Sequence, residues 1–166
     1  MTSNHQIRAY FRKVPDLQRR FGGVFSKDQL AGRAPDGKFY IVNLQDSGAG
    51  FGTHWVAVVD FMAVPVYIDP YGVHPPPIIA EFMSRSRSRE PWLYSAAQYQ
   101  TLESDQCGEY CVYFIEELWK HRTRPAVAMD RMDDELTQHP SARNEKVVSQ
   151  VALRERGRRA TGQRKS

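Results

Sequence analysis

Three residues that lie far apart in the sequence have side chains that together can carry out nucleophilic catalysis. They occur in the order His54, Asp69 and Cys107. A thiolate is a strong nucleophile, a neighbouring imidazole can take and return its proton, and a carboxylate can hold the imidazole in one orientation. This order predicts a cysteine hydrolase in which the His and the acid precede a thiol at the start of a helix.

The segments next to His54 and Asp69 predict how these two residues meet. Residues 55–61 and 66–69 are rich in β-branched and aromatic side chains, and a short turn joins them. Two such strands with a short connection form an antiparallel hairpin. His54 lies where the first strand begins and Asp69 where the second ends, so we expect them side by side. The carboxylate would then fix the tautomer of the imidazole.

Residues 107–121 form the clearest predicted helix, because apolar side chains recur there at helical spacing. Cys107 would lie in its first turn, where unpaired amides and the helix dipole favour a thiolate. Gly108 would let a substrate backbone approach closely. Cys111 falls one turn later on the same face, and we expect it to pack in the core. The two thiols lack the second pair of ligands that a zinc site requires, so no metal is expected.

Stabilisation of an oxyanion requires a hydrogen-bond donor near the nucleophile. Gln100, seven residues before Cys107, is a candidate, and its side-chain amide would act together with the backbone amide of Cys107. Gln98 and Gln106 compete for this role. Next to His54, either Trp55 contributes to a substrate cleft and covers the imidazole, or it is an ordinary strand aromatic. The substrate-cleft candidates are Trp55, Gly52 and Gly108.

The chain has 166 residues, 41% of them hydrophobic, and a net charge of +4, which fits one soluble domain. Residues 143–166 contain eight basic and two acidic residues, a net of +6, so residues 1–142 carry −2. We therefore expect a domain over 1–142 and a basic tail, at least partly disordered, over 143–166. Two clusters are candidates for nucleic-acid binding. They comprise Arg85, Arg87 and Arg89 and, in the tail, Arg156, Arg158 and Arg159.

Cysteine usage and hydropathy give expectations about the compartment. Two cysteines are too few for a disulfide scaffold, which favours a reducing intracellular setting. No apolar run reaches the roughly 20 residues that a membrane span needs, and residues 1–20 lack the apolar core of a signal peptide. We expect a monomer without a membrane partner.

The ordered set of motifs resembles the adenovirus-type cysteine proteases, the maturation endopeptidases called adenain. The matching elements are Ile41-Val42-Asn43, Gly52-Thr53-His54-Trp55, Asp69-Pro70-Tyr71-Gly72, and Gln100 before Cys107-Gly108-Glu109-Tyr110-Cys111. The resemblance covers roughly residues 20–150. It implies that His54 is the base, Asp69 the orienting acid, Cys107 the nucleophile and Gln100 the oxyanion residue. The family usually has Glu where Asp69 stands.

The resemblance also implies a substrate and a setting. The family cleaves viral capsid and core precursors at small-residue sites containing Gly, inside the assembling particle, which places it in the host nucleus and the virion. DNA stimulates it and, in adenoviruses, so does a peptide joined through a disulfide. Residues 1–106 contain no Cys. An activating peptide would therefore bind without that covalent link. We expect activation by DNA or by such a peptide, and no cofactor for the chemistry itself.

Two other functions remain open. Proteases of ubiquitin-like modifiers share the His–Asp–Cys order, the Gln before the Cys and the preference for Gly. A catalytically silent module that binds nucleic acid through the basic tail is the other. In each case the predicted fold is α+β, a mixed and mostly antiparallel sheet packed against the helix that begins at Cys107.

Overall fold

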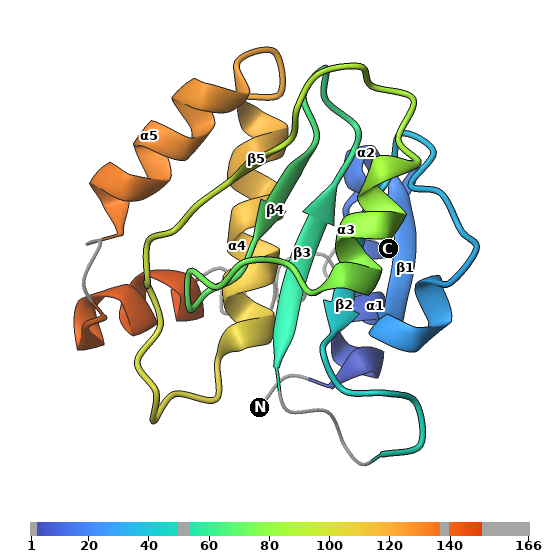
Figure 1. The fold of residues 1–166 in the computed structure, drawn as a ribbon. Coiled ribbons are helices and arrows are strands. Elements are labelled where there is room, and N and C mark those ends of the chain that lie inside the picture. The colour runs from blue at the N-terminus through green and yellow to red at the C-terminus, as the bar shows by residue number, and fades with distance from the viewer. Residues whose placement is uncertain (1–2, 50–53, 137–139, 151–166) are drawn as a thin grey trace, which may run out of the picture.

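The computed structural model describes residues 3–49, 54–136 and 140–150, and places one sheet between helices (Figure 1). The helices are α1 (Asn4–Phe11), α2 (Pro15–Gln18), the 3₁₀ helix η1 (Lys27–Leu30), α3 (Pro77–Ser84), α4 (Cys107–Lys120) and α5 (Pro125–Glu135). The strands are β1 (Phe21–Ser26), β2 (Phe39–Asn43), β3 (Trp55–Val59), β4 (Val66–Ile68) and β5 (Leu93–Tyr94).

The five strands form one mixed sheet in the order β1-β2-β3-β4-β5. The central pairs β2–β3 and β3–β4 are antiparallel, whereas β1–β2 and β4–β5 at the edges are parallel. The α+β class and the mixed sheet are therefore confirmed, with antiparallel pairing confined to the centre. Strand β1 is not predicted from the sequence. It contains two adjacent glycines, and a Cβ at Gly22 would lie 2.2 Å from the Tyr40 ring, so close packing of the strand requires glycine there.

The hairpin of β3 and β4 determines the position of the first two site residues. Its register pairs Ala57 with Ile68. Continued beyond the strand ends, the same register sets His54 opposite Tyr71, with Asp69 two residues away on the same side. The predicted hairpin thus brings His54 and Asp69 to one end of the sheet.

Both faces of the sheet are buried, which explains why β3 is entirely apolar. Trp55, Ala57 and Val59 point to the face covered by α4, whereas Val56 and Val58 point to the face covered by α3. Figure 1 shows α4 and α3 on opposite sides of the sheet. Because α4 packs directly against β3, the start of α4 is held beside the end of the sheet that carries His54.

The C-terminal part of the described chain differs from the expected domain boundary. Residues 142–150 are helical, and Asn144 and Val148 on this helix are fully buried. The packed body therefore extends to residue 150, beyond the predicted boundary after residue 142, because this helix contributes to the core. Helix α5 was not predicted either. Within the described residues, no helix has the length and apolar character needed to span a bilayer.

Candidate active site

His54 and Asp69 form a hydrogen-bonded pair at the end of the sheet. The Nε2 atom of His54 lies 2.7 Å from Oδ1 of Asp69. The Asp69 side chain is 1% exposed and that of His54 is 13% exposed, so solvent screens the pair weakly. Because Nε2 is engaged by the carboxylate, Nδ1 is the ring nitrogen left for proton transfer.

Tyr71 holds both members of this pair. Its backbone N–H donates to Oδ1 of Asp69 at 2.7 Å, which fixes the carboxylate. Its ring stacks on the His54 imidazole, with ring centroids 4.5 Å apart and an interplanar angle of 22°. Tyr71 belongs to the motif Asp69-Pro70-Tyr71-Gly72, but the sequence predicts no role for it. The register of the hairpin, which sets residue 71 opposite residue 54, is the signal that identifies it.

Cys107 opens α4 beside the imidazole. Its side chain is 5% exposed. The N-cap residue, Gln106, makes no side-chain hydrogen bond to the first turn, so no side chain caps these amides. Gly108 follows inside the helix and is buried. Amides that no side chain caps, together with the positive end of the helix dipole, favour an anion at Cys107.

The charge state of His54 links the three residues. Burial lowers its pKa, but hydrogen bonding and charge from Asp69 and Cys107 outweigh burial and raise the pKa to about 9. The Nδ1 atom is buried and has no hydrogen-bond partner among the described residues. Cys107 nevertheless lies close enough to the ring to raise its pKa. A protonated imidazole beside a thiolate is the ion pair that activates a nucleophilic cysteine.

Gln100 is fully buried in the segment that leads to α4. Its Nε2 donates to the carbonyl oxygen of Ser104 at 2.9 Å, and its backbone N–H donates to the carbonyl oxygen of Pro70 at 3.1 Å. The second bond attaches Gln100 to the turn that carries Asp69. An amide nitrogen has two hydrogens, so one remains for an oxyanion. Its Oε1 is buried with no partner in the described part of the chain.

Comparisons with known proteins add little to this geometry. No protein-family model matches the chain, and no curated protein matches its sequence. The crystal structure of the ASFV pS273R protease is similar to this chain, at 18% identity and a TM-score of 0.37 over 59% of this chain. The chain spans 43% of the length of that protease. The functional assignment depends on the side chains of the site themselves.

The competing glutamines are placed differently from Gln100. Gln98 is partly exposed, and its Nε2 donates to the carbonyl oxygen of Gln100 at 3.1 Å. Gln106 is also partly exposed, and its Oε1 lies 2.8 Å from the hydroxyl of Ser149. Gln100 is the buried member of the three, which makes its amide the best fixed.

The other expected cleft residues have mixed placements. The Trp55 side chain is 2% exposed and belongs to the core cluster under α4, and Tyr71 supplies the ring stacked on His54. The position of Trp55 is that of an ordinary strand aromatic. Gly108 lies next to the nucleophile. Gly52 lies outside the described residues.

Cys111 differs chemically from Cys107. It is fully buried one turn later in α4, and burial raises its pKa well above the usual range. It remains a protonated thiol that packs in the core, and the two cysteines form no disulfide. In the described part of the chain, no group of three or more His, Cys, Asp or Glu side chains is arranged to hold a metal.

The basic loop after α3 lies at the other end of β3 from the site. Arg85, Arg87 and Arg89 are exposed, and the serines between them are anchored: Ser86 donates to Asp60, and Ser88 donates to the carbonyl oxygen of Ala63. His54 precedes β3 and Asp60 follows it, a separation of roughly 16–20 Å along a five-residue strand. A phosphate group bound at these arginines would therefore lie at the far end of the strand from the triad. The tail arginines, Arg156, Arg158 and Arg159, lie outside the described residues.

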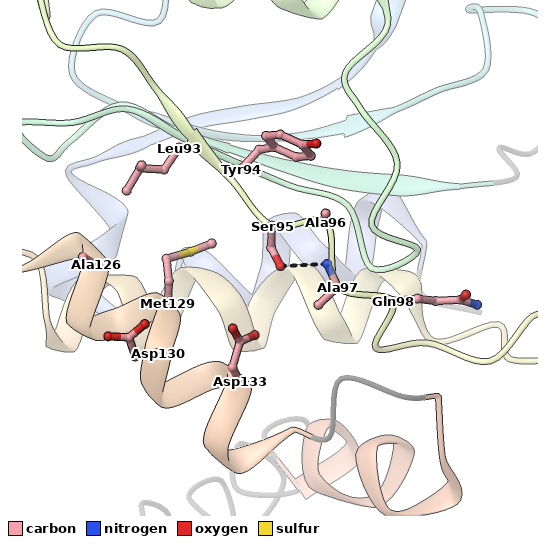
Figure 2. Close-up of a pocket in the computed structure, with 10 residues that line it drawn as sticks. All are labelled: Leu93, Tyr94, Ser95, Ala96, Ala97, Gln98, Ala126, Met129, Asp130 and Asp133. Atoms are coloured by element: carbon pink, nitrogen blue, oxygen red, sulfur yellow. Dashed lines mark hydrogen bonds between the residues drawn. The ribbon is translucent and has the colours of Figure 1, made fainter.

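A pocket of about 720 Å³ lies between the segment that follows β5 and helix α5 (Figure 2). Leu93, Ala96 and Ala97 line one side, and Met129, Asp130 and Asp133 line the other (with Tyr94, Ser95, Gln98 and Ala126). None of these residues belongs to the triad. Residues 96–97 line the pocket and also pack against the turn that follows Asp69. A Cβ at Gly72 in this turn would lie 2.5 Å from the carbonyl oxygen of Ala96.

Proposed function

We propose that the protein is a viral cysteine endopeptidase that cleaves capsid and core precursors at small-residue sites containing Gly during particle maturation. The observation that carries the proposal is the 2.7 Å bond between His54 and Asp69, with Cys107 close enough to the same ring to raise its pKa. The buried Gln100 and the uncapped first turn of α4 support it, since they supply donors for an oxyanion.

The reaction begins with the ion pair. The Sγ thiolate of Cys107 attacks the scissile carbonyl carbon, and the carbonyl electrons move onto oxygen. The Cys107 backbone N–H and the free hydrogen of Gln100 Nε2 stabilise that oxyanion. When the intermediate collapses, the C–N bond breaks and the leaving amine takes the proton from His54 Nδ1. The product is a thioester between the substrate acyl group and Cys107.

Hydrolysis of the thioester completes the cycle. His54 is now neutral and takes a proton from a water molecule, whose oxygen attacks the acyl carbon. The C–S bond breaks, the acid leaves and Cys107 returns as a thiolate beside imidazolium. Asp69 stays ionised throughout and orients the ring, and its bond to the Tyr71 amide keeps the carboxylate in place.

A cleavage experiment tests this proposal. The full chain is incubated with a peptide library derived from cellular proteins, and new termini are read by mass spectrometry. We expect cuts beside Gly and other small residues for the wild type and none for Cys107→Ala. Cys111→Ala is the matched control, because it removes the same atom one turn away in the core. Cleavage by intact Cys107→Ala would refute the proposal.

The alternative substrate class is a ubiquitin-like modifier. The same chemistry and the same preference for Gly would serve a deconjugating protease. A panel of modifiers with a vinyl sulfone at the C-terminus separates the two, because labelling of Cys107 by one modifier assigns the protein to that class. A silent nucleic-acid-binding module would give neither cleavage nor labelling.

Two activators are also proposed. DNA would bind the exposed arginines of the loop after α3 and the tail, by attraction to phosphate. A peptide would bind without a disulfide, and the pocket beside the two-residue edge strand β5 offers Asp130 and Asp133 for a basic side chain. Rates of peptide cleavage measured with and without each ligand test both.

A further inference from the structure

The C-terminal helix of residues 142–150 lies against the loop of residues 99–106, which carries Gln100 and leads to Cys107. Asn144 is fully buried, and its Nδ2 donates to the carbonyl oxygen of Tyr99 at 3.0 Å. At the other end of the loop, the Ser149 hydroxyl lies 2.8 Å from Oε1 of Gln106. The helix thus contacts the residue just before Gln100 and the residue just before Cys107.

Glu145 makes the central contacts of this helix. One oxygen, Oε2, accepts from the Ser104 hydroxyl at 2.6 Å. The other lies 3.1 Å from the Tyr110 hydroxyl, whose single hydrogen it shares with the carbonyl oxygen of Tyr99, also at 3.1 Å. The backbone N–H of Thr101 also points to this second Glu145 oxygen, at 3.4 Å. A carboxylate that accepts from a loop amide, a loop hydroxyl and the first turn of α4 ties these three parts together.

The contacts of Glu145 continue to the oxyanion donor. Ser104 bonds to Glu145 through its hydroxyl and accepts from Gln100 Nε2 through its carbonyl oxygen. The Gln100 side chain has no other hydrogen bond in the described part of the chain, since its Oε1 is unpartnered. The position of Ser104 therefore sets the direction of the Gln100 amide, and Glu145 sets the position of Ser104.

We propose that Glu145 is a positioning residue of the protease reaction: through Ser104 it aims the Gln100 amide at the oxyanion. This inference rests on the function proposed above. The role of Glu145 differs from that of the triad, because among the described residues no hydrogen bond joins Glu145 to His54 or Asp69. Loss of Glu145 should weaken stabilisation of the oxyanion and leave the thiolate–imidazolium pair intact.

Two rates distinguish these effects. Peptide cleavage needs the oxyanion donors, whereas alkylation of Cys107 by iodoacetamide needs only the thiolate. We expect Glu145→Ala to lower kcat by about 10- to 100-fold with little change in KM, because a donor misplaced by about 1 Å loses most of its effect. The rate of Cys107 alkylation should stay within about twofold of the wild type.

Further variants test the route through Ser104 and Gln100. Glu145→Gln keeps an acceptor and should recover most of the kcat. In a Gln100→Ala background, Glu145→Ala should lower kcat by less than about threefold, since the two residues act through one donor. Lys146→Ala, the exposed neighbour on the same helix, is the matched control and should leave kcat unchanged.

A measurement without substrate keeps the inference testable if the proposed function fails. The side-chain amide resonances of Gln100 are assigned by their absence from Gln100→Ala. They should shift and exchange faster with solvent in Glu145→Ala and in Ser104→Ala, but not in Lys146→Ala. Unchanged Gln100 resonances in folded Glu145→Ala would overturn the inference, whatever the protein cleaves. Alkylation that falls as much as kcat would also overturn it.

Discussion

Replacement of Asp69 by Asn should lower the pKa of His54 by more than roughly one unit. The bond from His54 Nε2 to Oδ1 is 2.7 Å in a site where Asp69 is 1% exposed. The partners raise the pKa of His54 from 6.5 to about 9 against burial, which alone would lower it. That rise corresponds to roughly 3 kcal/mol in favour of the imidazolium.

Asp69 and Cys107 raise the pKa of His54 by different amounts. The hydrogen bond to Asp69 makes the largest contribution that raises the His54 pKa, ahead of the contribution of Cys107. Asn has the same shape as Asp and keeps an acceptor for the Tyr71 amide, but it carries no charge. We expect the His54 pKa to be highest in the wild type, lower in Cys107→Ala and lowest in Asp69→Asn.

An NMR titration of the His54 Cε1 proton measures these values between pH 5 and 10. Asp130→Asn is the control, because it makes the same change in the pocket beside α5 and should leave the titration at about 9. The raised pKa of His54 also makes the free energy of unfolding depend on pH. Because the pKa is higher in the folded protein, the stabilisation from protonated His54 is complete below pH 6.5 and disappears as the pH rises through about 9. A titration in Asp69→Asn that still centres near 9 would refute the reasoning.

Two further predictions concern the turn after β4. Tyr71→Leu removes the ring stacked on His54 but keeps the backbone N–H that holds the carboxylate, so the pKa of His54 should fall by about half a unit, while Tyr71→Phe should leave it unchanged. Gly72→Ala should cost about 2–4 kcal/mol of unfolding free energy in urea, because its φ is +70° and its Cβ would lie 2.5 Å from the Ala96 carbonyl oxygen. Gly32→Ala has a similar φ of +72° with open space around the Cβ, so it should cost only about 1–2 kcal/mol. Equal losses for the two glycines would show that contact with Ala96 does not matter.

The sequence predicted the central part of the molecule well. β-branched and aromatic residues define β3 and β4, and their short connection favours the antiparallel pairing that joins His54 to Asp69. The helical spacing of apolar residues after Cys107 predicted α4 to within one residue. These are local patterns with one consistent structural solution.

The parts that were missed depend on contacts distant in the sequence. Strand β1 contains a Gly pair that favours a turn locally, but its parallel pairing with β2 and the close approach of Tyr40 stabilise it as a strand. The helix of residues 142–150 has a basic, tail-like composition, and only its burial of Asn144 and Val148 shows that it belongs to the core.

The roles of Tyr71 and Glu145 were equally hidden from the sequence. Tyr71 reaches His54 only through the register of the hairpin, and Glu145 reaches Ser104 across 41 residues of chain. Neither contact follows from a motif or a spacing. The Tyr71 contact requires the exact register of the hairpin, and the Glu145 contact requires the packing of the C-terminal helix, which no local pattern specifies.

The most direct test of the central claim is the rate at which iodoacetamide alkylates Cys107 at pH 6, read by mass spectrometry. An unpaired thiol is about 99% protonated at this pH and reacts slowly. If His54 holds Cys107 as a thiolate, the wild type should react at least about tenfold faster than His54→Ala, and the buried Cys111 should remain unlabelled in both. Equal rates of Cys107 alkylation in the two folded proteins would contradict the account.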